Sequence, residues 1–365
     1  MALILTFLGK GGTGRTTIAV ATAKRFAQQG KRVLLASQDT SPALSLFLGE
    51  TVGSQPTEVA PNLKATYLKS AQLLEQSWEQ LKSLEAQYVR TPFFKNVYGQ
   101  ELGVLPGMDS ALALNAIREY DASGAYDVIV YDGPSSQETL RMLGMPEILS
   151  WYVRRFRQVF LESDFWKAIS PFAQPVSSAV LSVDLSADNF SQPTNQVNNI
   201  LDQGKEAVAD PNRVVAYLVT TADDIAIATA RYLWGSAQQV CLTVGGVILN
   251  QANLSDSITE SFDPLKVHAV PEIPAQDWQI LTQALPDLSA IAKTAPRSIS
   301  VDVAKRQVSL FLPSFDKKQI KLTQYGPEVT IEAGDQRRNI FLPDPLRGKP
   351  VTGAKFQNNY LIISF

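Results

Sequence analysis

The chain has 365 residues, 45% of them hydrophobic, and a formal charge of −2, so it can bury a large core and form two domains. The balanced charge disfavours general nucleic-acid binding, and no run of about 18 apolar residues is present to span a membrane. One cysteine, Cys241, excludes a disulfide framework, and the one histidine, His268, is interpreted as a loop residue rather than a catalytic one. The start of the chain has no basic targeting segment, so a cytoplasmic location is expected.

A glycine-rich segment follows the first apolar strand, residues 2–8, and leads into a helical pattern over residues 17–29. Strand, loop and helix in this order are typical of a phosphate-binding loop, where backbone N–H groups and a helix N-terminus face a polyphosphate. Thr16 has the position of the hydroxyl that binds Mg²⁺, while Arg15 has the position of the usual loop lysine. The residues predicted to bind nucleotide here are Gly9, Lys10, Gly11, Gly12, Thr13, Gly14, Arg15, Thr16 and Thr17.

Buried strands and helices alternate along the next part of the chain. Strands are predicted at residues 31–37, 60–69, 126–131, 213–219 and 246–249, and helices at 42–48, 70–88, 110–120 and between the last two strands. Apolar strands that alternate with helices indicate an α/β fold with a doubly wound, mainly parallel sheet.

Two aspartates follow predicted strands of this sheet. Asp132 ends strand 126–131, where a carboxylate supports Mg²⁺ through water; the alternative is a cap on a helix near Gln137. Asp39 follows strand 31–37, a position from which it can reach an attacking water, and a helix cap is again the alternative.

The pattern changes after a short helix and linker at residues 286–296. Strands are predicted at 299–303, 307–312, 319–323, 328–332, 337–342, 351–356 and 360–365, with no helical signal between them. Short alternating strands separated by glycine, proline and asparagine indicate an antiparallel, all-β sandwich over residues 297–365.

The glycine loop with its front lysine, Lys10, resembles the deviant phosphate-binding loop of the SIMIBI class. Within that class the chain resembles the ArsA-type ATPases, which include arsenite-pump ATPases and the eukaryotic factor that targets tail-anchored proteins. Residues 33–49 (VLLASQDTSPALSLFLG) resemble the first switch of this family, and residues 132–141 (DGPSSQETLR) the second. Residues 337–343, 353–356 and 361–363 resemble an α-crystallin or small-heat-shock domain, for which a β-sandwich of other ancestry is the alternative.

The resemblance implies a dimeric ATPase that uses ATP and Mg²⁺, with a family domain over residues 1–290. By this resemblance Asp39 orients the water, Lys10 contacts nucleotide across a homodimer, Arg15 replaces the loop lysine, and Asn250 meets adenine. The cysteines that bind arsenite or zinc in relatives are absent, so no zinc or arsenite site is expected.

The family carries an apolar helical insertion that binds clients, and residues 145–208 are expected to correspond to it. Its aromatic segment, residues 145–172, is a candidate groove for apolar protein clients or a membrane surface; packing into the protein's own core is the alternative. Because of Arg15, hydrolysis is not assured. The alternative function is a non-hydrolysing, nucleotide-binding chaperone or scaffold with a degenerate phosphate loop.

Overall fold

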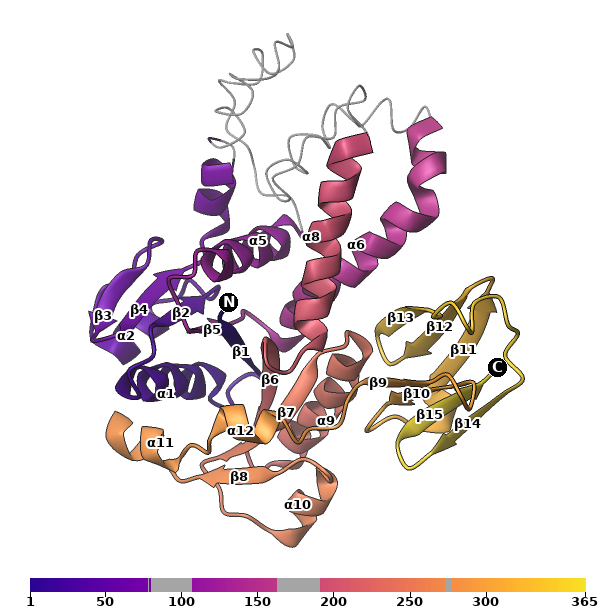
Figure 1. Cartoon of the computed structure of the whole chain (residues 1–365). Helices are drawn as coiled ribbons and strands as arrows, with labels where there is room; N and C mark the ends of the chain where they lie inside the picture. Colours follow the sequence, from indigo (N-terminus) through magenta and orange to yellow (C-terminus); the bar gives the residue numbers. More distant parts are fainter. Residues whose placement is uncertain (78, 80–106, 163–190, 273–276) are drawn as a thin grey trace.

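The N-terminal part of the protein is built on a twisted eight-stranded sheet with helices on both faces (Figure 1). The computed structural model describes residues 1–77, 79, 107–162, 191–272 and 277–365. The strand order is β3-β4-β2-β5-β1-β6-β7-β8, and every neighbouring pair is parallel except β3–β4. The strands are β1 (Leu3–Leu8), β2 (Val33–Ser37), β3 (Thr57–Ala60), β4 (Leu63–Tyr67), β5 (Val128–Asp132), β6 (Val214–Thr220), β7 (Thr243–Asn250) and β8 (Val267–Val270).

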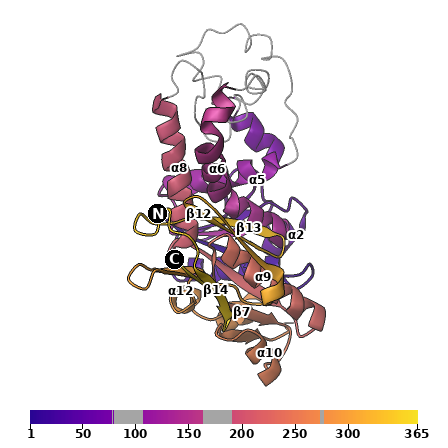
Figure 2. The ribbon, with the colours of Figure 1, turned by 90° about the vertical axis from the view of Figure 1, so that its right-hand side faces the viewer.

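Two hydrophobic cores cover the faces of this sheet, which is why its central strands are apolar along their whole length. One core joins the sheet to α5, α6 and α9, and the other joins it to α1, α11 and α12. The helices are α1 (Arg15–Gln28), α2 (Ala43–Leu48), α5 (Met108–Ala122), α6 (Ser136–Glu162), α8 (Ser191–Ala209), α9 (Asp224–Gln239), α10 (Asp256–Ser261), α11 (Trp278–Ala284) and α12 (Leu288–Ala292). Helices α6 and α8 pack against each other and rise together from the sheet (Figure 2).

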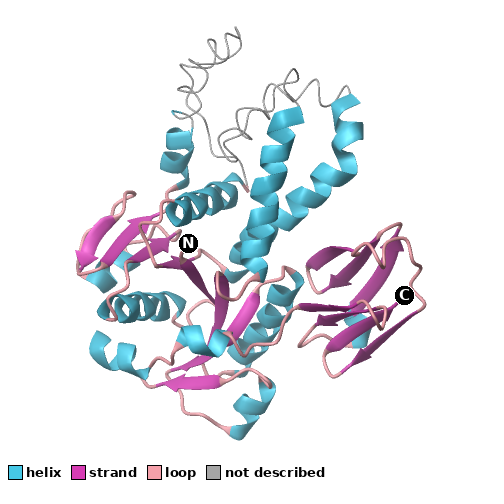
Figure 3. Ribbon diagram, in the orientation of Figure 1, coloured by secondary structure: helices cyan, strands magenta, loops and turns pink. Residues whose placement is uncertain are grey.

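The C-terminal part consists of strands and one short 3₁₀ turn, η2 (Lys317–Gln319) (Figure 3). One sheet has the order β14-β15-β10-β9 and the other β11-β12-β13, and all pairs are antiparallel. Buried side chains from both sheets form one common core, so the two sheets make a sandwich. Its strands are β9 (Ile299–Asp302), β10 (Gln307–Phe311), β11 (Ile320–Tyr325), β12 (Glu328–Ala333), β13 (Gln336–Phe341), β14 (Gly353–Gln357) and β15 (Tyr360–Ser364).

The predicted fold class is confirmed: a doubly wound, mainly parallel sheet and a C-terminal antiparallel sandwich of seven strands. His268 was predicted in a loop, and this is wrong, because it lies in the edge strand β8. The short β3, whose sequence TEVA has little apolar character, was not predicted. The domain boundary between residues 290 and 297 stays a prediction.

Some predictions fall partly outside the described residues. The helix expected over residues 70–88 is described only at 70–77 and 79, and the aromatic segment 145–172 only up to 162, with side chains described up to residue 153. None of the helices in the described ranges has the length and apolar character needed to cross a bilayer.

Candidate functional site

The glycine-rich loop connects β1 to α1 in the middle of the sheet, and two of its glycines have no room for a side chain. A Cβ on Gly9 would lie 2.1 Å from the backbone oxygen of Val219 in β6. A Cβ on Gly14 would lie 2.3 Å from Asn250 Nδ2, and Gly14 also has a φ of 93°. Inside the loop, the Thr13 hydroxyl donates to the Lys10 carbonyl at 2.9 Å. The loop therefore passes close to the ends of β6 and β7 before α1 starts.

Asn250, at the end of β7, contacts this loop through its side-chain amide. Its Nδ2 donates a buried hydrogen bond of 2.9 Å to the backbone oxygen of Thr13. The structure thus places Asn250 against the phosphate loop, whereas the resemblance implied a contact with adenine. Its contact with adenine stays a prediction.

Asp132 and Thr16 meet at the start of α1, although 116 residues separate them. The Thr16 hydroxyl lies 3.1 Å from Asp132 Oδ2 and 3.3 Å from Oδ1, and the Ser37 hydroxyl donates to Oδ2 at 3.1 Å. The Asp132 side chain does not cap the following helix; that role belongs to Ser135, whose hydroxyl accepts the Glu138 N–H.

Burial dominates the electrostatics of Asp132, which is only 3% exposed. Desolvation raises the pKa of its carboxyl, opposed by the hydrogen bond from Thr16, the nearby charge of Arg15 and the hydrogen bond from Ser37. A buried carboxylate beside two hydroxyls offers only oxygen donors, the set that Mg²⁺ prefers. Thr16 and Asp132 therefore fit the predicted Mg²⁺ site.

Arg15 points from the first turn of α1 toward the second switch segment, residues 132–141. Its guanidinium donates to the backbone oxygens of Gly133, at 3.5 Å, and Pro134, at 3.3 Å. A planar group with several N–H donors can reach two carbonyls at once, which a lysine ammonium on the same backbone cannot match in geometry. Arg15 thus ties the phosphate loop to the second switch.

Ser136 makes a second tie between these two segments. Its hydroxyl accepts the N–H of Gly9 and donates to the oxygen of Gly9, both at 2.9 Å and both buried. Ser136 and Ser37 were missed in the sequence. The pairing of β2 with β5 places Ser37 opposite Asp132, at the end of a strand that the sequence did predict. Ser136 follows a loop, and no sequence pattern indicated its contact with Gly9.

The remaining predicted residues surround the loop. Asp39 is exposed after β2; its Oδ1 accepts the Ser41 N–H at 3.0 Å, and its charge contributes to the raised pKa of Asp132. Asp39 does not cap α2, whose N-cap residue is Pro42. Lys10 and Gly11 are exposed at the front of the loop, and Thr17 is half-buried in the first turn of α1. Within the described residues, no group of three or more His, Cys, Asp or Glu side chains is placed to hold a metal ion.

Comparison with known proteins gives the context of this site. The sequence model of a family described as anion-transporting ATPase matches residues 2–271. A second model, described as an HSP20-like domain found in ArsA, matches residues 304–365.

Individual relatives align over nearly the whole chain or over part of it. A putative arsenical pump-driving ATPase of Chlorobaculum tepidum is 26% identical and aligns over 99% of this chain and 95% of its own length. A protein of Streptomyces coelicolor, described as uncharacterized, is 26% identical over 99% of this chain and 96% of its own. The ATPase GET3 of Malassezia globosa is 23% identical over 67% of this chain and 70% of its own length.

Proposed function

Because the chain belongs to the family of anion-transporting ATPases, we propose that its phosphate loop binds ATP with Mg²⁺ and works as a slow, dimeric ATP-driven switch. The observation that carries this proposal is the buried Asp132 carboxylate against the Thr16 hydroxyl, in the first turn of the helix that follows the glycine loop. This pairing supports a cation site with oxygen ligands next to the bound phosphates.

The roles of the surrounding residues follow from their positions. The loop backbone and the N-terminus of α1 hold the phosphates, Thr16 and Asp132 hold the cation, and Asp39 orients the attacking water. When bound, Mg²⁺ would neutralise charge on the β- and γ-phosphate oxygens. Lys10 contacts nucleotide in a second copy of the chain, and its exposure at the front of the loop supports this role.

Arg15 sets the expected rate. Its guanidinium lies against the carbonyls of Gly133 and Pro134, so it must leave them to contact a phosphate. This competition slows hydrolysis without removing the backbone contacts that bind nucleotide. ATP-dependent closure of the dimer would then expose or cover a surface for apolar protein clients.

A second candidate function, a non-hydrolysing nucleotide-binding chaperone or scaffold, is favoured by the same arginine. The two functions differ only in phosphate release. Titration calorimetry with Mg²⁺·ATP on the full chain tests the binding that they share. We expect a binding heat that saturates at a defined stoichiometry. A titration without binding heat would contradict both candidates.

Single-turnover assays on the parent, Arg15→Lys and Asp39→Asn proteins then separate hydrolysis from binding. Arg15→Lys is expected to release phosphate about tenfold faster or more, equivalent to about 1.4 kcal/mol of activation free energy. Asp39→Asn should bind ATP like the parent and hydrolyse it more slowly. Equal, measurable rates in all three proteins would show that neither residue acts in hydrolysis. No phosphate release from any of the three would favour the scaffold.

A further inference from the structure

Helix α6 starts inside the nucleotide site. Its first residue, Ser136, makes the two buried hydrogen bonds to Gly9, and Arg15 holds the carbonyls of the two residues Gly133 and Pro134 just before it. Any rearrangement of the second switch must therefore move, or be resisted by, this end of α6.

The same helix contacts the β-sandwich at two points, about one and a half and about four turns further on. The indole N–H of Trp151 donates to Glu328 Oε2 at 2.9 Å, and Arg141 pairs with Asp335 at 3.1 Å. The two contacts differ in weight. Both partners of the Arg141 pair are 64% exposed, which makes it weak, whereas Glu328 is 9% exposed and relies on its hydrogen bonds.

These contacts lie on either side of Pro146. Proline has no N–H to donate to the carbonyl four residues earlier, so a helix bends most easily there. Pro146 packs against α8 at Gly204, where an added Cβ would lie 3.0 Å from the proline ring. With the partly buried Trp151–Glu328 contact after the proline, and the weak Arg141 pair before it, the sandwich contacts α6 on both sides of the point where the helix bends most easily.

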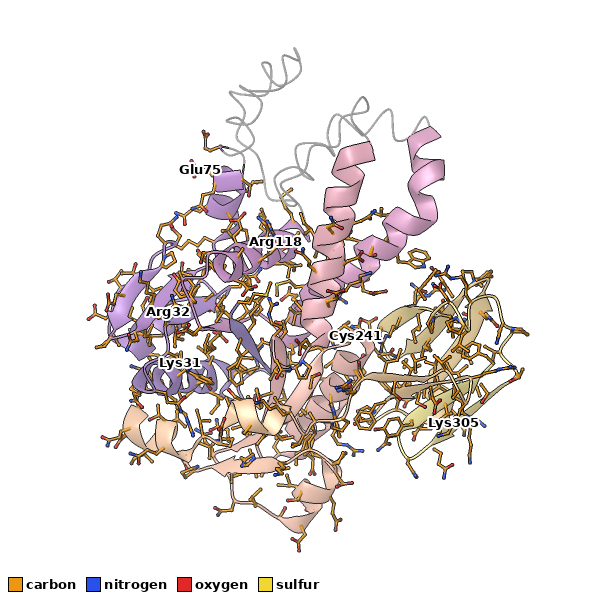
Figure 4. All side chains as sticks on the ribbon, viewed as in Figure 1. Lys31, Arg32, Glu75, Arg118, Cys241 and Lys305 are labelled. Atoms are coloured by element: carbon orange, nitrogen blue, oxygen red, sulfur yellow. The ribbon has the colours of Figure 1, made fainter. Side chains whose placement is uncertain are left out.

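The sandwich is itself fixed to the sheet through α9. Arg338 donates to the Gln238 carbonyl at 3.2 Å in a buried contact, and Phe311 packs edge-on against Trp234 with ring centres 5.6 Å apart. Cys241, two residues after the end of α9, marks the junction between the two parts (Figure 4). The sandwich can therefore serve as a fixed support for α6.

We propose that Glu328 is a positioning residue of the nucleotide site: through Trp151 it holds α6, and α6 in turn holds the second switch against the phosphate loop. The inference rests on the proposed function for its effect on ATP, but the mechanical link exists without nucleotide. By linkage, ATP binding at the loop and docking of the sandwich on α6 must change each other's free energy by the same amount.

The test uses hydrogen exchange of the full chain together with ATP titration. Glu328→Ala removes the acceptor for Trp151, so amide exchange in residues 133–141 should rise about fivefold or more, and the ATP dissociation constant should change by a similar factor. Glu328→Gln keeps a carbonyl oxygen that accepts the indole N–H, and it should restore parental values. Trp151→Phe, which removes the donor from the other side, should repeat the Glu328→Ala result.

Glu332→Ala is the matched control, because Glu332 lies on the same strand but pairs at the surface with Lys321 and Arg337. It should leave residues 133–141 and the ATP affinity unchanged. Unchanged exchange at 133–141 in both Glu328→Ala and Trp151→Phe would overturn the inference, whether or not ATP binds. If the two variants change exchange at 133–141 but the parent protein binds no ATP, the result would support the link and overturn the proposed function.

Discussion

Asp132 shows how one residue can serve a site at the expense of the fold. Its pKa is raised above the usual 3.8 because burial disfavours the carboxylate, and no lysine or arginine forms a salt bridge with it in the described part of the chain. The folded protein thus binds this proton more tightly than the unfolded chain does. The contribution of Asp132 to the free energy of unfolding falls as pH rises from 3.8 through the raised pKa. Above the raised pKa, the charged side chain destabilises the fold without its cation.

Asp132→Asn should therefore separate stability from function. Without nucleotide, the variant is expected to unfold roughly 2 °C higher at neutral pH, as about 1 kcal/mol would give in a domain of this size. The Mg²⁺-dependent part of ATP affinity should fall roughly 10- to 100-fold. Thermal unfolding at several pH values and ATP titration with and without Mg²⁺ measure both effects.

Asp127→Asn is the control, because Asp127 directly precedes β5, the strand that ends at Asp132. The pKa of Asp127 is lowered to about 2 by hydrogen bonds from Arg32, so its contribution has the opposite sign and is lost as pH falls through that value. Arg32 lies at the surface (Figure 4). This variant should unfold at a slightly lower temperature and bind ATP normally. A lower melting temperature in Asp132→Asn would show that its hydrogen bonds outweigh its burial.

At the scale of elements, the phosphate loop and the second switch form one hydrogen-bonded unit. Arg15 contributes to it from α1 and Ser136 from α6. The Ser136 hydroxyl accepts the Gly9 N–H and donates to the Gly9 carbonyl. Because these contacts are made by backbone atoms of Gly9, Gly133 and Pro134, the sequence of the loops need not reveal them.

Ser136→Ala should loosen this unit. The substitution leaves the buried N–H of Gly9 without a partner, at a cost of about 1–3 kcal/mol in the free energy of unfolding, and should weaken ATP binding as well. Ser135→Ala, which removes a helix cap worth about 1 kcal/mol, should lower stability while ATP affinity stays near parental. Urea unfolding and calorimetry compare the two. Equal losses of ATP affinity would show that Ser136 acts only through the stability of α6.

At the scale of the whole molecule, the interface between the sandwich and α9 is tightly packed. Phe315 lies over Gly235 of α9, where an added Cβ would be 2.5 Å from the ring and 2.6 Å from the Pro313 oxygen. Tyr232 of the same helix stacks edge-on with Phe315 and accepts the Asp335 N–H. Docking therefore depends on the absence of one methyl group.

Gly235→Ala should separate the two parts of the molecule. Overpacking of this kind costs about 1–3 kcal/mol, and here the backbone of residue 313 cannot move aside easily. We expect the variant to unfold in two calorimetric transitions where the parent shows one. Gly353→Ala, at an open position of β14, should behave like the parent. A single unshifted transition in Gly235→Ala would show that α9 and the sandwich can adjust to the extra carbon.

The sequence alone determined the features that depend on near neighbours in the chain. Glycine spacing after an apolar strand identified the phosphate loop, alternation identified the seven strands of the sandwich, and a carboxylate at a strand end identified Asp132. Short edge strands such as β3 and β8 were not predicted, because four residues are too few to show a periodic pattern.

Only the tertiary structure decided which distant residues meet. The pairing of β1 with β5 brings Thr16 to Asp132, and the docking of the sandwich on α9 brings Glu328 to Trp151. Such contacts depend on strand order and on how two cores fit together, and these arise from the packing of the whole chain. The phosphate loop could thus be predicted from its own sequence. Its contacts with the second switch, and the contact of α6 with the sandwich, could not.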